Sequence, residues 1–357
     1  MKNIKIAFLH NTLKHYRRDL FINLSNNFYI DFAFLKKINN EDKLNLIHVS
    51  ELWKRKYHLI VTGIYPEFEY APKVLVTLLI FKIKNVPIIG WSEFWNWPKV
   101  NFSDKVRHIL YYIYFFLALK FLDGLIVPSR KSFDYFYKIG FSSKPIFIIP
   151  NTTDMHPPDE LRTKRLKDML KLKGKKVILY LARVDRQKGL EYLIKAYAKL
   201  QRERNDVFLL IGGKIEPKYK KKIDYICNIL HINDYKFIGY VPNQVKNLYF
   251  NLCDVYVLPS LYDPFAITVV EAMMCGKPII VSKGVGASDL IINEYNGFIV
   301  NVADEEELYL ALKKALDPSI ARKIGKRALL TFHKKASIEV VTNNFIWLIN
   351  KMSLKCH

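Results

Sequence analysis

The sequence has few cysteines, no long apolar run and far fewer acidic than basic residues. Its 357 residues include four cysteines, at positions 227, 253, 275 and 356, with no Cys-x-x-Cys pair and no histidine nearby at the spacing of a zinc site. Four cysteines in a chain of this length do not make a disulfide scaffold. We therefore expect a reducing compartment, that is, a cytoplasmic protein.

Apolar runs are short throughout the chain. The longest, residues 109–119 with the sequence ILYYIYFFLAL, ends at Lys120. At about 1.5 Å per helical residue, this run covers roughly half of the ~30 Å hydrocarbon layer of a bilayer. The apolar run near the first residue is also too short for a secretory signal. The sequence therefore predicts neither a transmembrane helix nor a signal peptide.

Acidic residues are scarce, since 33 Asp and Glu stand against 56 Lys and Arg and leave a formal charge of +23. The excess is divided almost evenly between residues 1–150 and 151–357, so no basic tail carries it. Such a surface favours an anionic partner: nucleic acid, anionic lipid or a phosphorylated small molecule. Because there is no recognition-helix, zinc or RNA-binding signature, we expect no specific nucleic acid partner. A basic nucleic-acid-binding protein stays a remote alternative.

Half of the residues are hydrophobic and a quarter are charged, which is a globular composition, and the length suits two domains. Short apolar runs typical of buried parallel strands alternate with segments of helical spacing. The expected strands are residues 4–9, 29–34, 59–61, 86–89, 125–127 and 146–149, and then 177–181, 207–211, 237–238, 255–258 and 278–281. This alternation predicts an α/β fold with two doubly wound, Rossmann-like domains facing each other across a cleft.

A cluster of turn-forming residues from Pro150 to Pro158 is the best linker candidate. Between Ser337 and Leu354, apolar residues recur at helical intervals, so this segment should pack as a helix against another part of the chain. We therefore expect a first domain at 1–154, a second at 155–336, and a C-terminal helix at 337–357 that packs back on the first domain.

Ligands of open α/β sheets bind beyond the carboxyl ends of the strands, so the loops that follow the strands are the places to search. Arg183 and Lys188 follow the strand expected at 177–181, on a loop that leads into a helix. Arginine offers a bidentate fork, lysine a point charge and the helix N-terminus backbone donors, so this loop could clamp a diphosphate. The alternative is a solvated basic loop in a lysine-rich chain.

A second candidate loop lies before the last expected strand. Thr268 and Glu271 have the spacing of a capping box, which predicts that a helix begins at Thr268 and leaves residues 263–267 as a loop with open backbone amides. There, Asp263 could hold sugar hydroxyls while the amides receive phosphate oxygens. The alternative is purely structural: Asp263 caps a helix with Pro264 at its first position, and Glu271 only completes the capping box.

Residues 177 to about 300 resemble the donor-binding domain of retaining glycosyltransferases of family 4, the group 1 glycosyl transferases, which have the GT-B fold. The family's signature is two glutamates separated by seven residues, with Pro-Phe-Gly after the first, and here it stands as Asp263-Pro-Phe-Ala-Ile267 through Glu271. Further matches in family order are Ala182-Arg183 with Lys188-Gly189, Ile211-Gly212-Gly213, Phe237 to Val241, Asp254 to Ser260, Gly276-Lys-Pro278, and Gly286, Asp289, Asn296 and Gly297. The first part agrees more loosely, through Tyr16-Arg17, residues 123–129 and residues 149–154.

The resemblance implies a role for each matched residue. Arg183 and Lys188 would neutralise the diphosphate of a UDP- or GDP-linked sugar and so take part in catalysis, and Glu271 would hold the ribose. Asp263 would contact the donor sugar at the reacting centre. The base pocket would be lined by Tyr240 and Val241, and backbone donors to phosphate and sugar would come from Phe265, Ala266 and Ile267.

The resemblance also implies that the first domain binds the acceptor, on the side of His10, Asn11, Tyr16, Arg17 and Trp91. Where many relatives have a catalytic histidine after the strand at 86–89, this chain has Gly90-Trp-Ser-Glu93, so Glu93 would hold the catalytic position nearest the anomeric carbon. Glu93 could equally be a buried ion-pair partner. Asp263 and Ala266 stand where the family usually has Glu and Gly, a difference that concerns the identity of the donor sugar more than the activity.

By analogy with the family, the sugar would pass to a glycan, glycolipid or lipid-linked acceptor with retention of anomeric configuration. The departing phosphate can itself take the acceptor's proton, so neither a metal nor another cofactor is expected. The chain has no Asp-x-Asp triplet of the metal-dependent GT-A class, and the acidic residues 304–307 are typical of the first turn of a helix. A nucleotide-sugar epimerase or phosphorylase on the same fold is the main alternative.

Two interpretations of the apolar run at 109–119 stay open. It can be a buried helix between layers of the fold. It can also be a monotopic patch, flanked by Lys105, Arg107 and Lys120, that brings the protein to an anionic membrane surface and its lipid-linked acceptors. The second interpretation would make the protein peripheral at the cytoplasmic face of a membrane.

Overall fold

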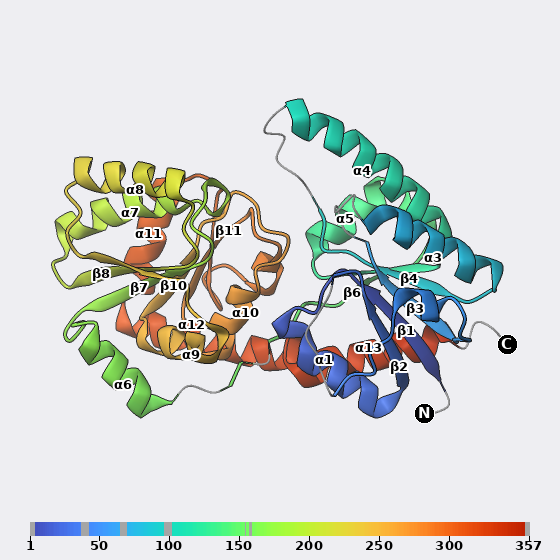
Figure 1. Ribbon diagram of the computed structural model, residues 1–357. Coiled ribbons are helices and arrows are strands. Elements are labelled where there is room, and N and C mark those ends of the chain that lie inside the picture. Colours follow the sequence, from blue (N-terminus) through green and yellow to red (C-terminus); the bar gives the residue numbers. More distant parts are fainter. Residues whose placement is uncertain are drawn as a thin grey trace. The chain divides into compact units, whose positions relative to one another are not determined.

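The computed structural model describes residues 4–36, 43–64, 70–95, 102–153, 155–156 and 159–353. The chain folds as two compact units (Figure 1). Unit 1 comprises Met1–Asp154 together with the C-terminal segment Ile338–His357, and unit 2 comprises Met155–Ser337. Within the described residues, no helix combines the length and the apolar character needed to cross a bilayer.

Unit 1 is built on six parallel strands in the order β2-β1-β3-β4-β5-β6. Their bounds are β1 Lys5–His10, β2 Tyr29–Phe34, β3 Leu59–Gly63, β4 Ile88–Trp91, β5 Gly124–Val127 and β6 Ile146–Ile148. In this register Phe8 of β1 lies opposite Phe32 on one side and Val61 on the other. Because the chain runs outward from β1 in both directions, the loops after the central strands diverge at the carboxyl ends and leave room for a site.

Helices cover both faces of this sheet. On one face, α1 (His15–Asn27) packs against α13 (Ile338–Ser353), whose apolar residues Val341, Phe345 and Leu348 are buried with those of β1 and β3. The other face is covered by α2 (Val49–Leu52), α3 (Ala71–Ile83), α4 (Phe102–Phe121) and α5 (Arg130–Lys138). The prediction that the C-terminal helix returns to the first unit is confirmed.

Unit 2 repeats the plan with six parallel strands in the order β12-β11-β10-β7-β8-β9. Their bounds are β7 Lys176–Leu181, β8 Val207–Gly212, β9 Tyr235–Gly239, β10 Val255–Leu258, β11 Ile279–Ser282 and β12 Phe298–Val300. Strands β7 and β10 are neighbours, with Val255 opposite Ile178. After β7 the chain proceeds toward β8 and β9, and after β10 it proceeds the other way, so the switch point of the sheet lies between these two strands.

The helices of unit 2 also form two layers. One layer consists of α7 (Leu190–Glu203), α8 (Pro217–Ile229) and α11 (Glu305–Ala315), and the other of α6 (Glu160–Met169), α9 (Asn243–Leu252), α10 (Ile267–Met274) and α12 (Pro318–Lys335). Two short 3-10 turns, η3 (Arg186–Lys188) and η4 (Gly286–Leu290), lie in the loops after β7 and β11.

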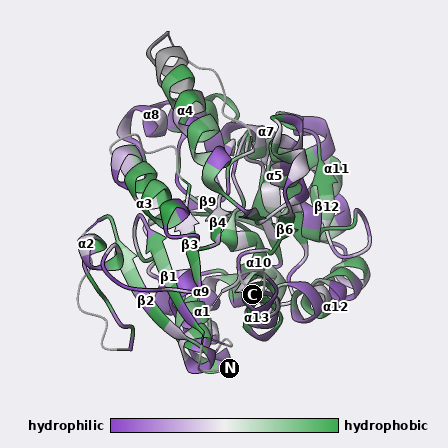
Figure 2. Ribbon diagram, turned by 90° about the vertical axis from the view of Figure 1, so that its right-hand side faces the viewer, coloured by the Kyte–Doolittle hydropathy of each residue, from purple (hydrophilic) through white to green (hydrophobic). Residues whose placement is uncertain are grey.

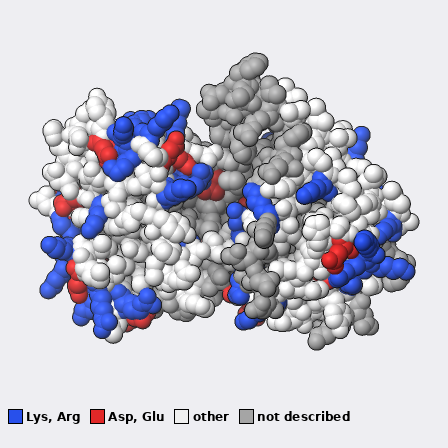
Figure 3. Space-filling view, viewed as in Figure 1, with Lys and Arg blue, Asp and Glu red and all other residues white. Residues whose placement is uncertain are grey.

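Each strand predicted from the sequence overlaps an observed strand, and the prediction of two doubly wound α/β units is confirmed. Strand β12 was missed because it has only three residues, directly after Gly297. Basic side chains are distributed over both units on the face shown in Figure 3, with acidic side chains among them. The described residues of this face therefore do not form one continuous basic stripe.

Candidate active site

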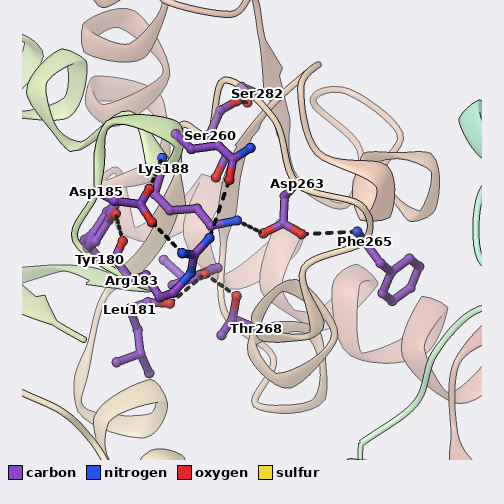
Figure 4. A network of polar contacts seen from close by, with 12 residues as sticks. Tyr180, Leu181, Arg183, Asp185, Lys188, Ser260, Asp263, Phe265, Thr268 and Ser282 are labelled. Carbon is purple, nitrogen blue, oxygen red and sulfur yellow. Dashed lines mark hydrogen bonds and ion pairs between the residues drawn. The ribbon is translucent and has the colours of Figure 1, made fainter. Parts of the chain in front are cut away.

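In unit 2 the loops that follow β7 and β10 touch at the carboxyl ends of these neighbouring strands (Figure 4). The Leu261 amide donates a hydrogen bond of 2.8 Å to the Gln187 carbonyl, which ties the two loops together. Gly189 has a φ of 68°, and a Cβ at this position would lie 2.1 Å from the Pro259 carbonyl oxygen. Only glycine fits such a contact, so the Lys188-Gly189 pair of the sequence is explained by the approach of the two backbones.

This contact brings Lys188 and Asp263 together. The Lys188 Nζ lies 2.6 Å from Asp263 Oδ2, although 75 positions separate the two residues in the sequence. Lys188 is 7% exposed. Because the pair is largely screened from water, its attraction is stronger than that of a surface pair. The structure thus places the cation expected to bind a diphosphate against the carboxylate expected to contact the donor sugar, as Figure 4 shows.

Arg183 lies on the same loop but is largely exposed. Its guanidinium pairs with Asp185 at 2.9 Å and donates to Gln187 Oε1 at 3.4 Å. Asp185 also caps η3, because its Oδ1 accepts a 3.1 Å hydrogen bond from the Lys188 amide. Asp185 therefore orders the loop that carries both cations, and the sequence analysis missed it. The available signal was its position three residues before Lys188, which is the spacing of an N-cap.

The predicted start of α10 is wrong by one residue, and the predicted capping box is absent. The helix begins at Ile267, and its N-cap is Ala266, whose φ of 67° lies in the left-handed region. The Thr268 hydroxyl bonds to the Tyr256 hydroxyl at 2.7 Å instead of a backbone amide. Tertiary partners have therefore taken the side chains that the local pattern assigned to the cap.

The backbone amides of residues 263–267 are only partly open. The Asp263 amide donates to the Gly284 carbonyl at 2.9 Å, and the Phe265 amide to Asp263 Oδ1 at 3.1 Å. Asp263 thus closes a turn before the helix and does not cap it. Among the described residues none accepts a hydrogen bond from the Ala266 or Ile267 amide, as expected for the first turn of a helix. Two donors at the N-terminus of α10 are therefore available to an anion.

Glu271 forms a second, more deeply buried ion pair. Its Oε1 lies 2.7 Å from the Nζ of Lys246 on α9, and the two residues are 2% and 8% exposed. The sequence analysis missed Lys246 because it is one of many lysines, lies 25 positions away and has no local signal that points to Glu271. The pair fixes the direction of the carboxylate that the family resemblance assigns to the ribose.

The two residues expected at the base pocket differ in their surroundings. Tyr240 is largely exposed after β9, whereas Val241 is buried in the core of unit 2. The side chain of Val241 is therefore occupied by packing, and only its backbone is left to meet a nucleotide. Phe265 is also buried in this core, in agreement with a role through its backbone alone. The part of each residue in nucleotide binding stays a prediction.

In unit 1, the acceptor-side residues of the sequence analysis gather at the carboxyl ends of β1 and β4. The Arg17 guanidinium contacts Glu93 and His10, and it lies over the Trp91 ring, 4.3 Å from the centroid. Asn151, which the sequence analysis did not select, donates from Nδ2 to Glu93 Oε1 at 2.7 Å. The ion pair foreseen as the alternative for Glu93 is therefore present, and a catalytic role for Glu93 stays a prediction.

The other acceptor-side residues frame this ion pair. Tyr16 lies with its hydroxyl 3.5 Å from Glu93 Oε1, and the Asn11 side chain accepts from the Thr12 amide at 2.8 Å. Burial, and next the charge of Arg17, hold the pKa of His10 well below its ordinary value. His10 is therefore neutral at pH 7 and acts as a hydrogen-bonding and packing group. Within the described residues, no three His, Cys, Asp or Glu side chains are grouped as metal ligands would be.

Residues 162–329, most of unit 2, match the model of the family described as glycosyl transferases group 1. Unit 2 is a group 1 glycosyl transferase domain. The family signature of the sequence thus lies in this domain, at the loops that meet at the switch point of the sheet.

Similar proteins extend the comparison beyond the group 1 domain. An uncharacterized glycosyltransferase of Methanocaldococcus jannaschii is 31% identical over 141 residues, which is 40% of this chain and 36% of that protein. The lipopolysaccharide 1,2-N-acetylglucosaminetransferase of Salmonella typhimurium is 25% identical over 235 residues, 62% of this chain and 60% of the enzyme. The chain thus spans less than two thirds of the length of these relatives.

The fold of the whole chain is shared with solved structures. The crystal structure of Anabaena HepE in complex with UDP superposes with a TM-score of 0.82 over 98% of this chain and 100% of that one, at 18% identity. At this level of identity the likeness concerns the fold. The predicted GT-B fold class is confirmed.

Proposed function

We propose that the chain is a glycosyltransferase that moves a sugar from a nucleotide-diphosphate sugar to a glycan, glycolipid or lipid-linked acceptor. The observation that carries the proposal is the Lys188–Asp263 pair, held at the carboxyl ends of β7 and β10 in a group 1 domain. The fold neighbour HepE has been solved with UDP and with UDP-glucose, which supports a uridine-linked donor as the first candidate.

The geometry of unit 2 suits the departure of a nucleoside diphosphate. Cleavage of the bond between sugar and phosphate builds negative charge on the leaving diphosphate, and Lys188, Arg183 and the open amides of Ala266 and Ile267 would receive it. Since Lys188 already pairs with Asp263, an incoming diphosphate would compete for the ammonium group. The Asp263 Oδ2 that now faces Lys188 would then accept hydrogen bonds from the donor sugar's hydroxyls. Glu271, oriented by Lys246, would hold the ribose.

We further propose that the transfer retains the anomeric configuration and needs no metal. The leaving phosphate would take the proton of the acceptor hydroxyl on the face from which it departs. The acceptor would bind on the unit 1 cluster around Arg17, Trp91 and Glu93, whose carboxylate is held by Arg17 and Asn151. A carboxylate fixed in this way can stabilise positive charge that develops at the anomeric carbon.

The donor is tested by thermal shift with a panel of UDP-, GDP- and ADP-sugars. We expect the sugars of one nucleotide to raise the melting temperature with a saturating concentration dependence. Lys188→Gln should abolish the shift. The matched control is Lys176→Gln, because Lys176 begins the strand that Lys188 follows and forms an ion pair of its own with Asp254 at 3.2 Å. A flat response of the wild-type protein to every donor would refute the proposal.

The reaction is tested by product analysis with the donor that binds. Release of nucleoside diphosphate together with a new glycosidic product on a lipid or glycan extract supports a transferase. An epimerised nucleotide sugar, or a free sugar phosphate formed with inorganic phosphate, would instead identify an epimerase or a phosphorylase. The anomeric configuration of the product and the rate in the presence of a chelator test retention and metal independence.

A further inference from the structure

Helices α3 and α4 each carry an exposed apolar stripe. The exposed residues of α3 are Val76, Leu79 and Ile83, and those described on α4 are Ile109, Leu110, Ile113, Phe116 and Leu117. Their exposed fractions range from 41% to 73%. The spacings of three, four and seven residues place each set along one side of its helix. We name these eight residues the α3–α4 surface.

Both stripes face outward from the same layer of unit 1. Val74, Leu78 and Phe81 of α3 and Phe115 and Ala118 of α4 are buried in one core, on one face of the sheet. Because α3 and α4 pack against each other there, the opposite sides of both helices point away from the sheet. Figure 2 shows the apolar character of both helices side by side. The run at 109–119 is thus neither fully buried nor fully exposed.

The α3–α4 surface adjoins an apolar depression. Its volume is about 380 Å³, and it is lined by Ile113, Phe115, Phe116, Leu117, Leu119 and Ile139. A contiguous apolar area of this kind is rare on a soluble protein without a partner. A depression lined only by apolar side chains suits a hydrocarbon segment rather than a polar ligand.

The charges within the two stripes have one sign, and Asp123, which follows α4, is paired with Lys82 of α3 at 2.8 Å. Helix α3 and residues 109–121 contain no acidic residue, and the lysines among and beside them are exposed. Lys84 follows the α3 stripe, but its Nζ donates to the Trp53 carbonyl. Lys73 precedes the stripe, and Lys120 ends the α4 stripe with its Nζ 5.1 Å from the Phe116 ring centroid. Lysine stems of this kind cover apolar surface while the ammonium groups reach outward. The side chains of Lys105 and Arg107 lie outside the described residues.

We propose that the α3–α4 surface docks this protein onto an anionic lipid leaflet. The apolar stripes would enter the boundary between headgroups and acyl chains, and Lys73 and Lys120 would meet the anionic headgroups. This is monotopic binding, in the plane of the interface. The inference concerns unit 1 and does not rest on the proposed transferase activity.

Charge is the reason to choose a lipid over a second copy of the chain. An interface between two α3–α4 surfaces would be self-complementary, so it would set lysines of one copy beside those of the other, with no acidic residue in α3 or in residues 109–121 to compensate. An anionic leaflet offers the opposite sign to every lysine. The net charge of +23 strengthens the same preference over long range.

The test is co-sedimentation of the full chain with vesicles of phosphatidylcholine alone and of phosphatidylcholine with phosphatidylglycerol. The variants are Ile113→Glu and Phe116→Glu, singly and together. The controls are Ile292→Glu and Leu310→Glu in unit 2, which have similar exposure, 56% and 50% against 54% and 58%. A second set of variants, Lys73→Gln and Lys120→Gln, is compared with the controls Lys218→Gln and Lys221→Gln. The control substitutions change exposed lysines of α8.

We expect wild-type binding to the anionic vesicles only. Each apolar substitution should raise the lipid concentration for half-saturation roughly five- to tenfold, and the substitution of Lys73 or Lys120 should raise it about fivefold. The control substitutions should have little effect. Melting curves confirm that the variants fold. The donor thermal shift, measured on the same proteins, should be unchanged, so that failure here is distinct from failure of the proposed function.

Four results would overturn the inference. One is the absence of wild-type binding to anionic vesicles. Another is an equal loss of vesicle binding with the α3–α4 substitutions and with the control substitutions. A third is vesicle binding that salt abolishes but that the double variant Ile113→Glu with Phe116→Glu retains. Either of these two results would indicate general adsorption of a basic protein. The fourth is a concentration-dependent dimer that the same substitutions dissociate, which would assign the surface to a second copy.

Discussion

Lys246 and Glu271 offer the sharpest test of how unit 2 is held together. They are the most deeply buried ion pair described in this unit, and their atoms are 2.7 Å apart. We consider Lys246→Met, which keeps the length and the packing of the side chain but removes the charge. The variant leaves the Glu271 carboxylate, 2% exposed, without its cation.

Removal of one partner from a buried pair costs about 3–5 kcal/mol, because the remaining charge stays desolvated. Lys246 retains 8% exposure, so we expect the lower end, about 3 kcal/mol. For a unit of this size such a loss lowers the melting temperature by roughly 6–12 °C. The double variant Lys246→Met with Glu271→Met replaces both charges by apolar groups, which is often neutral or stabilising. We therefore expect it to regain most of the lost stability.

The distribution of tryptophan makes the assay specific to one unit. The five tryptophans, at positions 53, 91, 95, 97 and 347, belong to unit 1. Urea unfolding followed by tryptophan fluorescence therefore reports on unit 1, whereas circular dichroism reports on both units. Lys246→Met should shift the circular dichroism transition much more than the fluorescence transition. Lys176→Met, at a half-exposed ion pair, is the control and should cost less than about 1 kcal/mol.

The reasoning fails if Lys246→Met costs less than 1 kcal/mol, or if the double variant is as unstable as the single one. The same double variant separates stability from function. If Glu271 holds the ribose, the double variant folds but shows no thermal shift with the donor. A retained shift would remove Glu271 from the nucleotide site.

Three further predictions concern both units. Burial and the charge of Arg17 lower the pKa of His10 in the folded protein. Below about pH 6.5 the unfolded chain therefore binds a proton at His10 that the folded protein does not bind. The unfolding free energy should then fall by about 1.4 kcal/mol per pH unit below that value. His10→Gln should lose this contribution in urea titrations between pH 7 and 5.5, and an unchanged pH dependence would contradict it. Ala266 has a φ of 67°, so Ala266→Gly should stabilise the protein by up to about 1 kcal/mol. The control Ala321→Gly, inside α12, should lower the unfolding free energy by about 1 kcal/mol. A lower unfolding free energy in both variants would show that Ala266 is unstrained. Glu93→Gln keeps a hydrogen-bond acceptor for Asn151 but removes the charge opposite Arg17. We expect the rate of sugar transfer to fall more than tenfold and the donor thermal shift to stay unchanged. Equal transfer rates of variant and wild type would leave Glu93 a structural residue.

Much of the architecture followed from periodicity, because parallel strands buried on both faces are continuous apolar runs such as residues 255–258. The same logic located Arg183, Lys188 and Asp263, since residues at the carboxyl ends of adjacent strands must meet at the switch point. What could not be predicted depends on pairing over long sequence distances. Lys246 is 25 positions from Glu271, and nothing in its neighbourhood distinguishes it from other lysines.

The start of α10 shows why a strong local pattern can mislead. Thr268 and Glu271 have the spacing of a capping box, but Tyr256 takes the hydroxyl and Lys246 takes the carboxylate. Both partners come from elements that are packed against α10 only in the folded unit. Similarly, the run at 109–119 was expected to be either buried or a surface patch. Among its described residues one side is buried and the other is exposed, and membrane binding by the exposed side stays a prediction.

The return of α13 to unit 1 has a consequence for biosynthesis. The sheet face that carries β1 and β3 is completed by residues 338–353, but the 183 residues of unit 2 must be translated first. At about 5–20 residues per second, this imposes a delay of roughly 10–40 s during which an apolar surface of the nascent chain has no permanent cover. The second unit can thus reach its native state on the ribosome before the first. During this interval a chaperone could bind the uncovered apolar surface of the first unit.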